Sequence, residues 1–214
     1  MCATNHFEAG AFIRSKKGIK HPDVQYHFFP GAVEEQKDVI EVHAYQIHCG
    51  TMRPKSRGYL KLKSSNPKDR PIIQPNLLSH QQDLEDLKDS VRLTAEVLNA
   101  KSFEKNRRRH LNFDGKTILD DKLLEDWVKK HAESAYHCIG TCAMGKVTES
   151  DGRVKGVNRL RVCDASLMPD LVSGNTNAPT IMMAEKISDM IKGKSLPPSS
   201  APVYVAPNWE TNQR

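Results

Sequence analysis

The hydrophobic pattern changes its period near residue 80, and this change constrains the fold more than any other feature. Before it, apolar residues occur in short runs bounded by turn residues, at 7–13, 24–29, 39–47 and 58–64. Runs of this kind predict strands. After it, Leu84, Leu87 and Val91 recur at helical spacing with charges between them. The sequence therefore predicts an α+β fold, in which strands precede helices.

The strand-like runs indicate an antiparallel sheet with one solvent-exposed side. Residues 24–29 alternate roughly with period two, and in 58–64 Tyr59, Lys61 and Lys63 fall on one face. Leu60 and Leu62 fall on the other face, which is the pattern of a half-buried strand.

Three helices and one further strand are expected in the rest of the chain. The helices are predicted at 82–99, at about 120–131 with Asp120 or Asp121 as the cap, and from Pro179 to Ile191. A short strand is expected within 156–166, and the Pro- and Ser-rich tail from Ser195 is expected to be irregular.

Charge and cysteine content narrow the class of protein. The 214 residues carry a formal net charge of +6, with one dense basic stretch at 105–110. That stretch fits either an anionic membrane or nucleic acid, or simply a solvated helix end. No aromatic residue interleaves with it, which argues against nucleic acid. Five cysteines without an apolar leader favour reduced thiols, and no apolar run has the length of a membrane span.

Two polar turns about forty residues apart carry the candidate chemistry. The first, 136–145, holds His137 among glycines, and the second, 173–180, holds Asn175 before an apolar helix. A neutral imidazole can accept an alcohol proton, and a carboxamide can donate to the alcohol oxygen. The alternatives are a structural or solvated histidine and an Asx turn.

Other kinds of site are poorly supported by the sequence. Cys138 and Cys142 flank the histidine loop, but Cys163 stands alone, so no metal is expected. No glycine-rich phosphate loop follows a strand, so this chain is not expected to bind a nucleotide alone. Glu8 lies in an apolar run, where it either faces solvent or lines a pocket that suits a quaternary ammonium group.

Several stretches of the chain resemble the C-terminal part of the glucose-methanol-choline (GMC) flavin oxidoreductases, and among them the choline branch. The stretches that specify the family are YHCIGTCAMG at 136–145, GVNRLRVCDASLMP at 156–169 and SGNTNAPTIMMAEKISD at 173–189. HFEAGAFIRS, HPDVQYHFFP, GYLKLKSSNPKDRPIIQPNLLS and PVYVAP point to the choline branch less specifically.

The resemblance implies roles for individual residues. His137 matches the base that acts on the alcohol while hydride moves to the flavin, and Asn175 matches the second active-site position. Glu8 matches a carboxylate that faces the substrate's trimethylammonium group. The family's contacts with FAD correspond here to residues in two short stretches: Asp164, Ala165, Asn177, Ala178 and Thr180.

The resemblance also implies the domain organisation. Residues 1–132 match a substrate-binding domain, an antiparallel sheet covered by helices. Residues 133–194 match the histidine loop and a strand–helix segment that returns to an FAD-binding domain, and 195–214 form a tail. The family's glycine-rich FAD motif is absent from this sequence, so an N-terminal FAD-binding half is expected to be missing.

The function implied by the resemblance is oxidation of a primary alcohol of the choline type. The expected cofactor is FAD, and the expected electron acceptor is not a nicotinamide. Peripheral membrane association and, in animals, the mitochondrial inner membrane are implied as the location. The alternative is a flavin-free remnant that acts as a binding or interaction protein.

Overall fold

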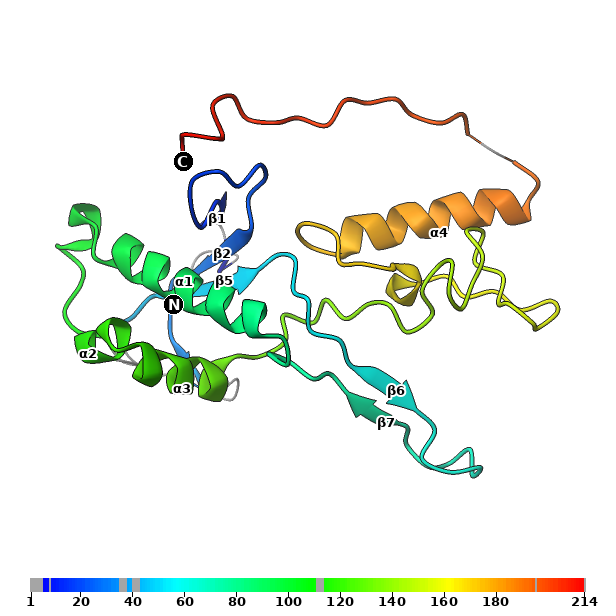
Figure 1. The fold of residues 1–214 in the computed structure, drawn as a ribbon, viewed down its shortest axis with the longest axis horizontal. Helices are drawn as coiled ribbons and strands as arrows, with labels where there is room; N and C mark the ends of the chain where they lie inside the picture. Colours follow the sequence, from blue (N-terminus) through cyan, green and yellow to red (C-terminus); the bar gives the residue numbers. More distant parts are fainter. Residues whose placement is uncertain are drawn as a thin grey trace. The chain divides into compact units, whose positions relative to one another are not determined.

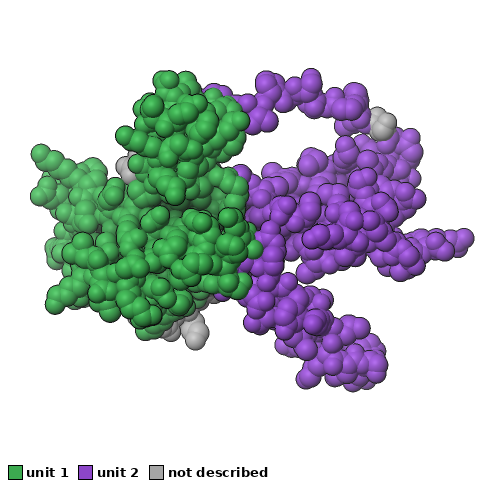
Figure 2. All heavy atoms as spheres, in the orientation of Figure 1, with its two compact units in different colours: residues 1–55, 78–133, 205–214 green, residues 56–77, 134–204 purple. Residues whose placement is uncertain are grey.

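The chain forms two compact units, which are distinguished by colour in Figure 2. The computed structural model describes residues 6–7, 9–34, 38–39, 43–110, 114–194 and 196–213. Unit 1 consists of residues 1–55, 78–133 and 205–214, and unit 2 of residues 56–77 and 134–204.

Unit 1 is built on a three-stranded antiparallel sheet, in the order β1-β2-β5. Its strands are β1 (Ala9–Ile13), β2 (Val24–Phe29) and β5 (Gln46–Thr51) (Figure 1). The first two lie where the sequence predicts them. The third predicted run is divided: β4 (Asp38–Val39) pairs with β3 (Val33–Glu34), and β5 starts at the end of the run.

Three helices accompany this sheet. They are α1 (Gln81–Leu98), α2 (Gly115–Leu119) and α3 (Asp121–His131), with a short 3-10 turn, η1, at Lys101–Phe103. The side chain of Asp120 accepts a hydrogen bond from the Leu123 N–H at 2.9 Å, which satisfies a donor that the helix leaves free. The predicted cap of α3 is thereby confirmed.

Helix α1 supplies both parts of the core of unit 1. Leu84 and Val91 pack with Leu124 and Val128 of α3. Leu93 packs with Val24 and Tyr26 of β2, so the helix also covers one face of the sheet. Because side chains alternate along a strand, the residues between these, such as Gln25 and His27, belong to the opposite face.

A buried lysine ties α1 to α3. The Lys88 side chain is 1% exposed, and its Nζ lies 2.8 Å from Asp121 and 3.0 Å from Glu85. The hydrogen bond to Asp121 raises the pKa of Lys88 and lowers that of the Asp121 carboxyl. A buried ammonium group needs such partners because its desolvation is otherwise uncompensated.

Unit 2 contains one helix, α4 (Asn177–Ile191), one 3-10 turn, η2 (Ala165–Leu167), and one hairpin within its described residues. The hairpin pairs β6 (Tyr59–Lys61) with β7 (Ile72–Gln74). Leu60 and Leu62 are exposed, so the prediction of a buried face on this strand was wrong. A sheet of two strands has few neighbours on either face.

The strand predicted within 156–166 is also absent. Only an isolated bridge between Arg153 and Arg161 forms there. Gly156 and Arg159 both have positive φ, at 75° and 60°, so the chain turns tightly where a strand would have to begin. Asp164 then starts η2, which leaves too few residues for a ladder.

A close backbone contact fixes this turn-rich segment. The Val162 N–H donates to the Gly152 carbonyl at 2.9 Å. A Cβ at Gly152 would lie 2.5 Å from the Val162 carbonyl oxygen, and the residue has a φ of 79°. Both conditions require glycine at this position.

Among the described residues, no helix combines the length and the apolar character that crossing a bilayer requires.

We predict that Leu124→Ala lowers the free energy of unfolding by about 2–5 kcal/mol, because it leaves a cavity in the core of unit 1. Leu124 is 0% exposed. The matched control is Leu119→Ala, whose side chain is 87% exposed and which should change stability by less than about 0.5 kcal/mol. Denaturant unfolding measures both, and equal effects would contradict the packing described.

We predict that Gly152→Ala destabilises unit 2 clearly more than Gly156→Ala. Both positions have positive φ, which costs an alanine about 1–2 kcal/mol. Only at Gly152 does the added Cβ also meet a carbonyl oxygen; at Gly156 nothing lies within 4 Å. Thermal unfolding of the two variants isolates the steric contribution, and identical melting temperatures would show that the contact is not tight.

Candidate functional site

The histidine loop begins with two local constraints. Tyr136 has a φ of 61°, and its N–H donates to Ser134 Oγ at 3.0 Å. Gly140 has a φ of 90°, which favours glycine. These turns bracket His137, which is half-buried. A half-buried imidazole retains access to a ligand while its neighbours restrict its position.

Backbone hydrogen bonds join this loop to the turn at η2. The Cys142 N–H donates to the Ser166 carbonyl at 3.0 Å, and the Met144 N–H donates to the Leu167 carbonyl at 2.9 Å. Thr148, which is fully buried, donates from its hydroxyl to the Cys142 carbonyl at 3.0 Å. The loop that carries His137 and the turn that carries Asp164 and Ala165 are thus parts of one assembly.

Asp164 has a structural role in that turn. Its Oδ1 accepts a hydrogen bond from the Ser166 N–H at 2.8 Å and another from the Ser166 hydroxyl. It therefore caps η2. Any ligand at Asp164 has mainly the second carboxylate oxygen, Oδ2, to contact.

The start of α4 leaves backbone donors without a side-chain cap. The helix begins at Asn177, two residues before the predicted start, and its N-cap, Thr176, makes no capping hydrogen bond through its side chain. Pro179 has no N–H to offer. Asn177 and Ala178 are both exposed in this first turn. Uncapped N–H groups at a helix start favour an acceptor oxygen or negative charge beside them.

The remaining predicted site residues are Thr180, Asn175 and Glu8. Thr180 donates both its backbone N–H, at 3.0 Å, and its hydroxyl, at 2.7 Å, to the Thr176 carbonyl, so neither donor is directed to a ligand. Asn175 is exposed on the turn before α4, in the same unit as His137. Glu8 lies outside the described residues.

Sequence reasoning missed an aromatic and imidazole cluster on the uncovered face of the sheet in unit 1. His27 pairs directly with His48 across β2 and β5. The Phe7 ring stacks on Phe29, with centroids 5.5 Å apart, and stands edge-on to both imidazoles at 6.3 Å. We call Phe7, His27, Phe29 and His48 the open-face cluster. The alternation along 24–29 indicates that His27 and Phe29 share a face opposite Val24 and Tyr26, but the pairing of His27 with His48 depends on the strand register, which the sequence does not give.

The electrostatics of the open-face cluster favour a neutral imidazole at His48 near neutral pH. Partial burial, and then the facing His27, lower the pKa of His48 from its ordinary value of 6.5. The Glu133 carboxylate opposes this shift. His48 is exposed to solvent, so its burial is partial. The cluster therefore places aromatic rings and the His48 imidazole near a carboxylate, which is a favourable setting for a cation.

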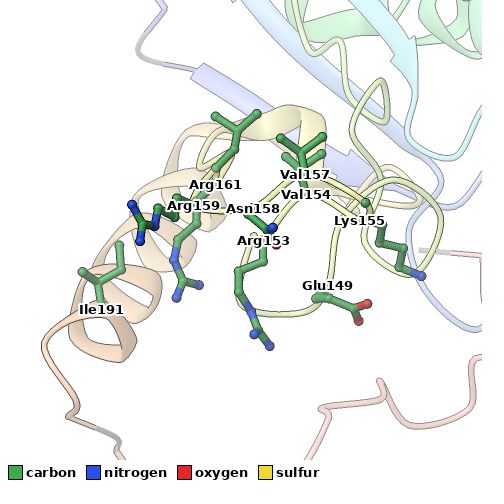
Figure 3. Close-up of a pocket in the computed structure, with 11 residues that line it drawn as sticks. Glu149, Arg153, Val154, Lys155, Val157, Asn158, Arg159, Arg161 and Ile191 are labelled. Carbon is green, nitrogen blue, oxygen red and sulfur yellow. The ribbon is translucent and has the colours of Figure 1, made fainter.

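A further pocket lies in unit 2. It has a volume of about 890 Å³, and its lining includes the basic residues Arg153, Lys155 and Arg161. Arg153 and Arg161 both pair with Asp151, at 2.7 and 3.1 Å, and Lys155 donates to the Gly145 carbonyl at 2.7 Å. Figure 3 shows the charged ends of Arg153 and Lys155 pointing apart. The pocket contains none of the expected site residues.

No group of three or more histidine, cysteine, aspartate or glutamate side chains gathers as a metal site within the described ranges. Cys138, beside His137, is exposed, and its Sγ lies 3.9 Å from Ser134 Oγ.

Comparison with known proteins places this geometry in a family. The family model for GMC oxidoreductase matches residues 54–184. The oxygen-dependent choline dehydrogenase of Photobacterium profundum is 43% identical over 220 residues, which cover 99% of this chain and 39% of the relative. An Escherichia coli protein of the same name is 43% identical over 210 residues, covering 95% of this chain and 38% of the relative.

Solved structures share the fold. Pyridoxine 4-oxidase from Mesorbium loti matches with a TM-score of 0.77 at 22% identity, over 89% of this chain and 39% of that one. A fungal aryl-alcohol oxidase matches with a TM-score of 0.66 at 24% identity, over 80% of this chain and 28% of that one.

These matches set the scope of the conclusions. The chain spans about two fifths of the length of the curated relatives it matches. Both relatives are bacterial, so they lend no support to a mitochondrial location. The resemblance seen in the sequence is confirmed, and so is the α+β architecture of antiparallel sheets and helices: the chain belongs to the GMC oxidoreductase family.

Proposed function

We propose that this chain is the substrate-binding and proton-accepting part of an FAD-dependent enzyme that oxidises choline, a primary alcohol, to its aldehyde. The observation that carries this proposal is the joining of the His137 loop to η2 by the Cys142 and Met144 hydrogen bonds. Relatives that match nearly the whole chain are named choline dehydrogenases, which supports the choice of substrate. The activity is proposed for the whole enzyme, since this chain covers only part of those relatives.

The first turn of α4 fits a flavin. Asn177 and Ala178 present backbone N–H groups that no side chain caps, and a flavin ring has carbonyl oxygens that accept such bonds. Asp164 would contact the cofactor through Oδ2, and Ala165 would contribute contact area beside it. Thr180 would contribute only its hydroxyl oxygen and methyl group, because its donors bond to Thr176. FAD, when bound, accepts the hydride; the electrons then leave for an acceptor other than a nicotinamide.

His137 accepts the hydroxyl proton of the alcohol in this proposal. Imidazole is a common base for this step, because one ring nitrogen can accept a proton while the other keeps its own. Asn175 donates an amide hydrogen to the substrate oxygen and so fixes the hydroxyl toward the base. The two residues together would orient the O–H bond of the substrate toward His137.

Within unit 1, the open-face cluster offers a surface that suits a quaternary ammonium group such as that of choline. A trimethylammonium group has no N–H to donate, so it is bound by charge and by ring faces. Phe7 and Phe29 offer apolar rings, the lowered pKa of His48 favours its uncharged form, and Glu133 places a carboxylate within electrostatic reach of His48. Glu8 stays a prediction for the same recognition.

If the chain instead belongs to a flavin-free binding protein, the purified protein should be colourless and should not reduce a dye when choline is added. The proposed enzyme carries bound flavin when purified whole and reduces a dye when choline is added. A colourless protein that neither reduces a dye nor regains turnover with FAD and an FAD-binding half supplied would favour the remnant.

We predict that His137→Ala lowers kcat with choline by about 100- to 10,000-fold, the usual effect of removing a positioned base. Dye reduction under saturating choline measures kcat, and flavin absorbance at equal protein concentration shows whether cofactor content is retained. His110→Ala, in an exposed basic stretch, is the matched control and should keep wild-type kcat. Equal rates in both variants would remove His137 from the reaction.

We predict that choline binds at the open-face cluster of unit 1 with a dissociation constant that rises as pH falls through the lowered pKa of His48, below 6.5. Above that pKa the ring is neutral; below it the ring becomes cationic and repels the trimethylammonium group, by roughly three- to tenfold in the dissociation constant. Groups that face His48 and set this behaviour are His27 and Glu133.

The neutral isostere 3,3-dimethylbutan-1-ol supplies the control for this pH effect. Its dissociation constant should not follow the same titration, because it has no charge to repel. His48→Gln should flatten the choline profile, whereas His110→Gln should not. Parallel pH profiles for choline and the isostere would show that His48 does not sense the substrate's charge.

A further inference from the structure

One arginine of unit 1 is buried without an anion. Arg14 directly follows β1 and is 9% exposed. Its Nε is shielded from solvent and has no hydrogen-bond partner within the ranges that the structure describes. Arg14 also makes no ion pair with any described residue. Lys88, the other deeply buried cation, has two carboxylates within 3.0 Å.

Asp23, in the connection between β1 and β2, accepts hydrogen bonds from Ser15. Asp23 Oδ1 accepts the Ser15 N–H at 2.7 Å, and Asp23 Oδ2 accepts the Ser15 hydroxyl at 2.6 Å. The carbonyls of Arg14 and Ser15 accept hydrogen bonds from Gln213 Nε2, at 3.2 and 2.8 Å. The backbone around Arg14 is thus held in place, while among the described residues its buried Nε–H has no acceptor to offset its desolvation.

A small pocket lies at this arginine. It has a volume of about 280 Å³, and its lining is Phe12, Ile13, Pro22 and Gln213 together with Arg14. Three of these residues are apolar, and Arg14 is the only charged group among them. Guanidinium presents Nε–H and an adjacent Nη–H as a planar pair of donors that matches the two oxygens of a carboxylate.

We propose that this pocket binds a carboxylate, which Arg14 holds side-on through its Nε–H and one Nη–H after a shift of the side chain that opens Nε to the pocket. A short apolar body on the carboxylate contacts Phe12, Ile13 and Pro22. The carboxylate belongs either to a free small organic acid or to an acidic side chain of the same enzyme. The inference does not depend on the proposed function, because neither flavin nor alcohol takes part.

The test observes the Arg14 Nε–H directly, by ¹⁵N–¹H spectra of the protein as purified, at constant ionic strength. Loss of one cross-peak in Arg14→Lys assigns it, and Arg109→Lys, at an exposed position, supplies a comparison peak. Propionate is the probe, and propionamide and chloride are the controls. If a free acid is the ligand, the Arg14 peak shifts saturably with propionate alone while the Arg109 peak stays unchanged.

The two sources give different spectra, and both support carboxylate binding. If the enzyme's own side chain fills the pocket, the Arg14 peak is shifted downfield and protected from exchange before any addition, and propionate has no effect. A peak at the position of free arginine that ignores propionate would overturn the proposal. An equal response to propionamide or chloride would overturn it as well, because the site would then not select a carboxylate.

Discussion

Helix α1 lies against only one face of the β1-β2-β5 sheet, and the arrangement of unit 1 depends on this one-sided packing. Leu93 meets Val24 and Tyr26 on the covered face, while Leu84 and Val91 turn the other side of the helix toward α3. Since a strand alternates its side chains, burying Val24 and Tyr26 brings His27 and Phe29 to the face that α1 leaves uncovered. The same packing therefore makes the core and exposes the open-face cluster.

Unit 2 holds its candidate site residues in place in a different way. Few side chains are buried there, and the histidine loop is held by backbone bonds to η2 and by the buried Thr148. Glycines at positive φ, such as Gly140 and Gly152, let these loops approach one another closely. A loop held by its main chain can present His137 and Asp164 without using their side chains for stability, although Asp164 still caps its own turn.

The sequence predicted the elements whose signal is local. Helical spacing in α1 and α3, the Asp120 cap and the alternation of β2 are each visible within a few residues, and all were confirmed. The prediction of a strand within 156–166 was wrong because Arg159 adopts a positive φ. This backbone conformation is uncommon for a residue other than glycine, and the sequence does not indicate it. The prediction that β6 has a buried face was wrong as well. Alternation along a strand indicates which side chains could be buried, but it does not show whether another element packs against them.

Most of the candidate site was predicted by family motifs rather than by physical patterns. His137 and Asn175 each sit in a turn with an equally good structural explanation, and only the motif singled them out. The open-face cluster was missed because it depends on pairing between strands about twenty residues apart, as His27 and His48 show. The unsatisfied Nε–H of Arg14 was missed because the sequence does not indicate which acceptors lie near a buried arginine in the folded chain.

The central claim is that His137 receives the alcohol proton, and the pH dependence of flavin reduction tests it most directly. The rate of anaerobic flavin bleaching by saturating choline would be followed by stopped-flow absorbance across pH in the wild-type enzyme and in His137→Gln. The account predicts that the wild-type rate rises with pH to a plateau as one group loses its proton, and that this titration disappears in the variant. An unchanged titration in His137→Gln would assign the base to another residue and contradict the account.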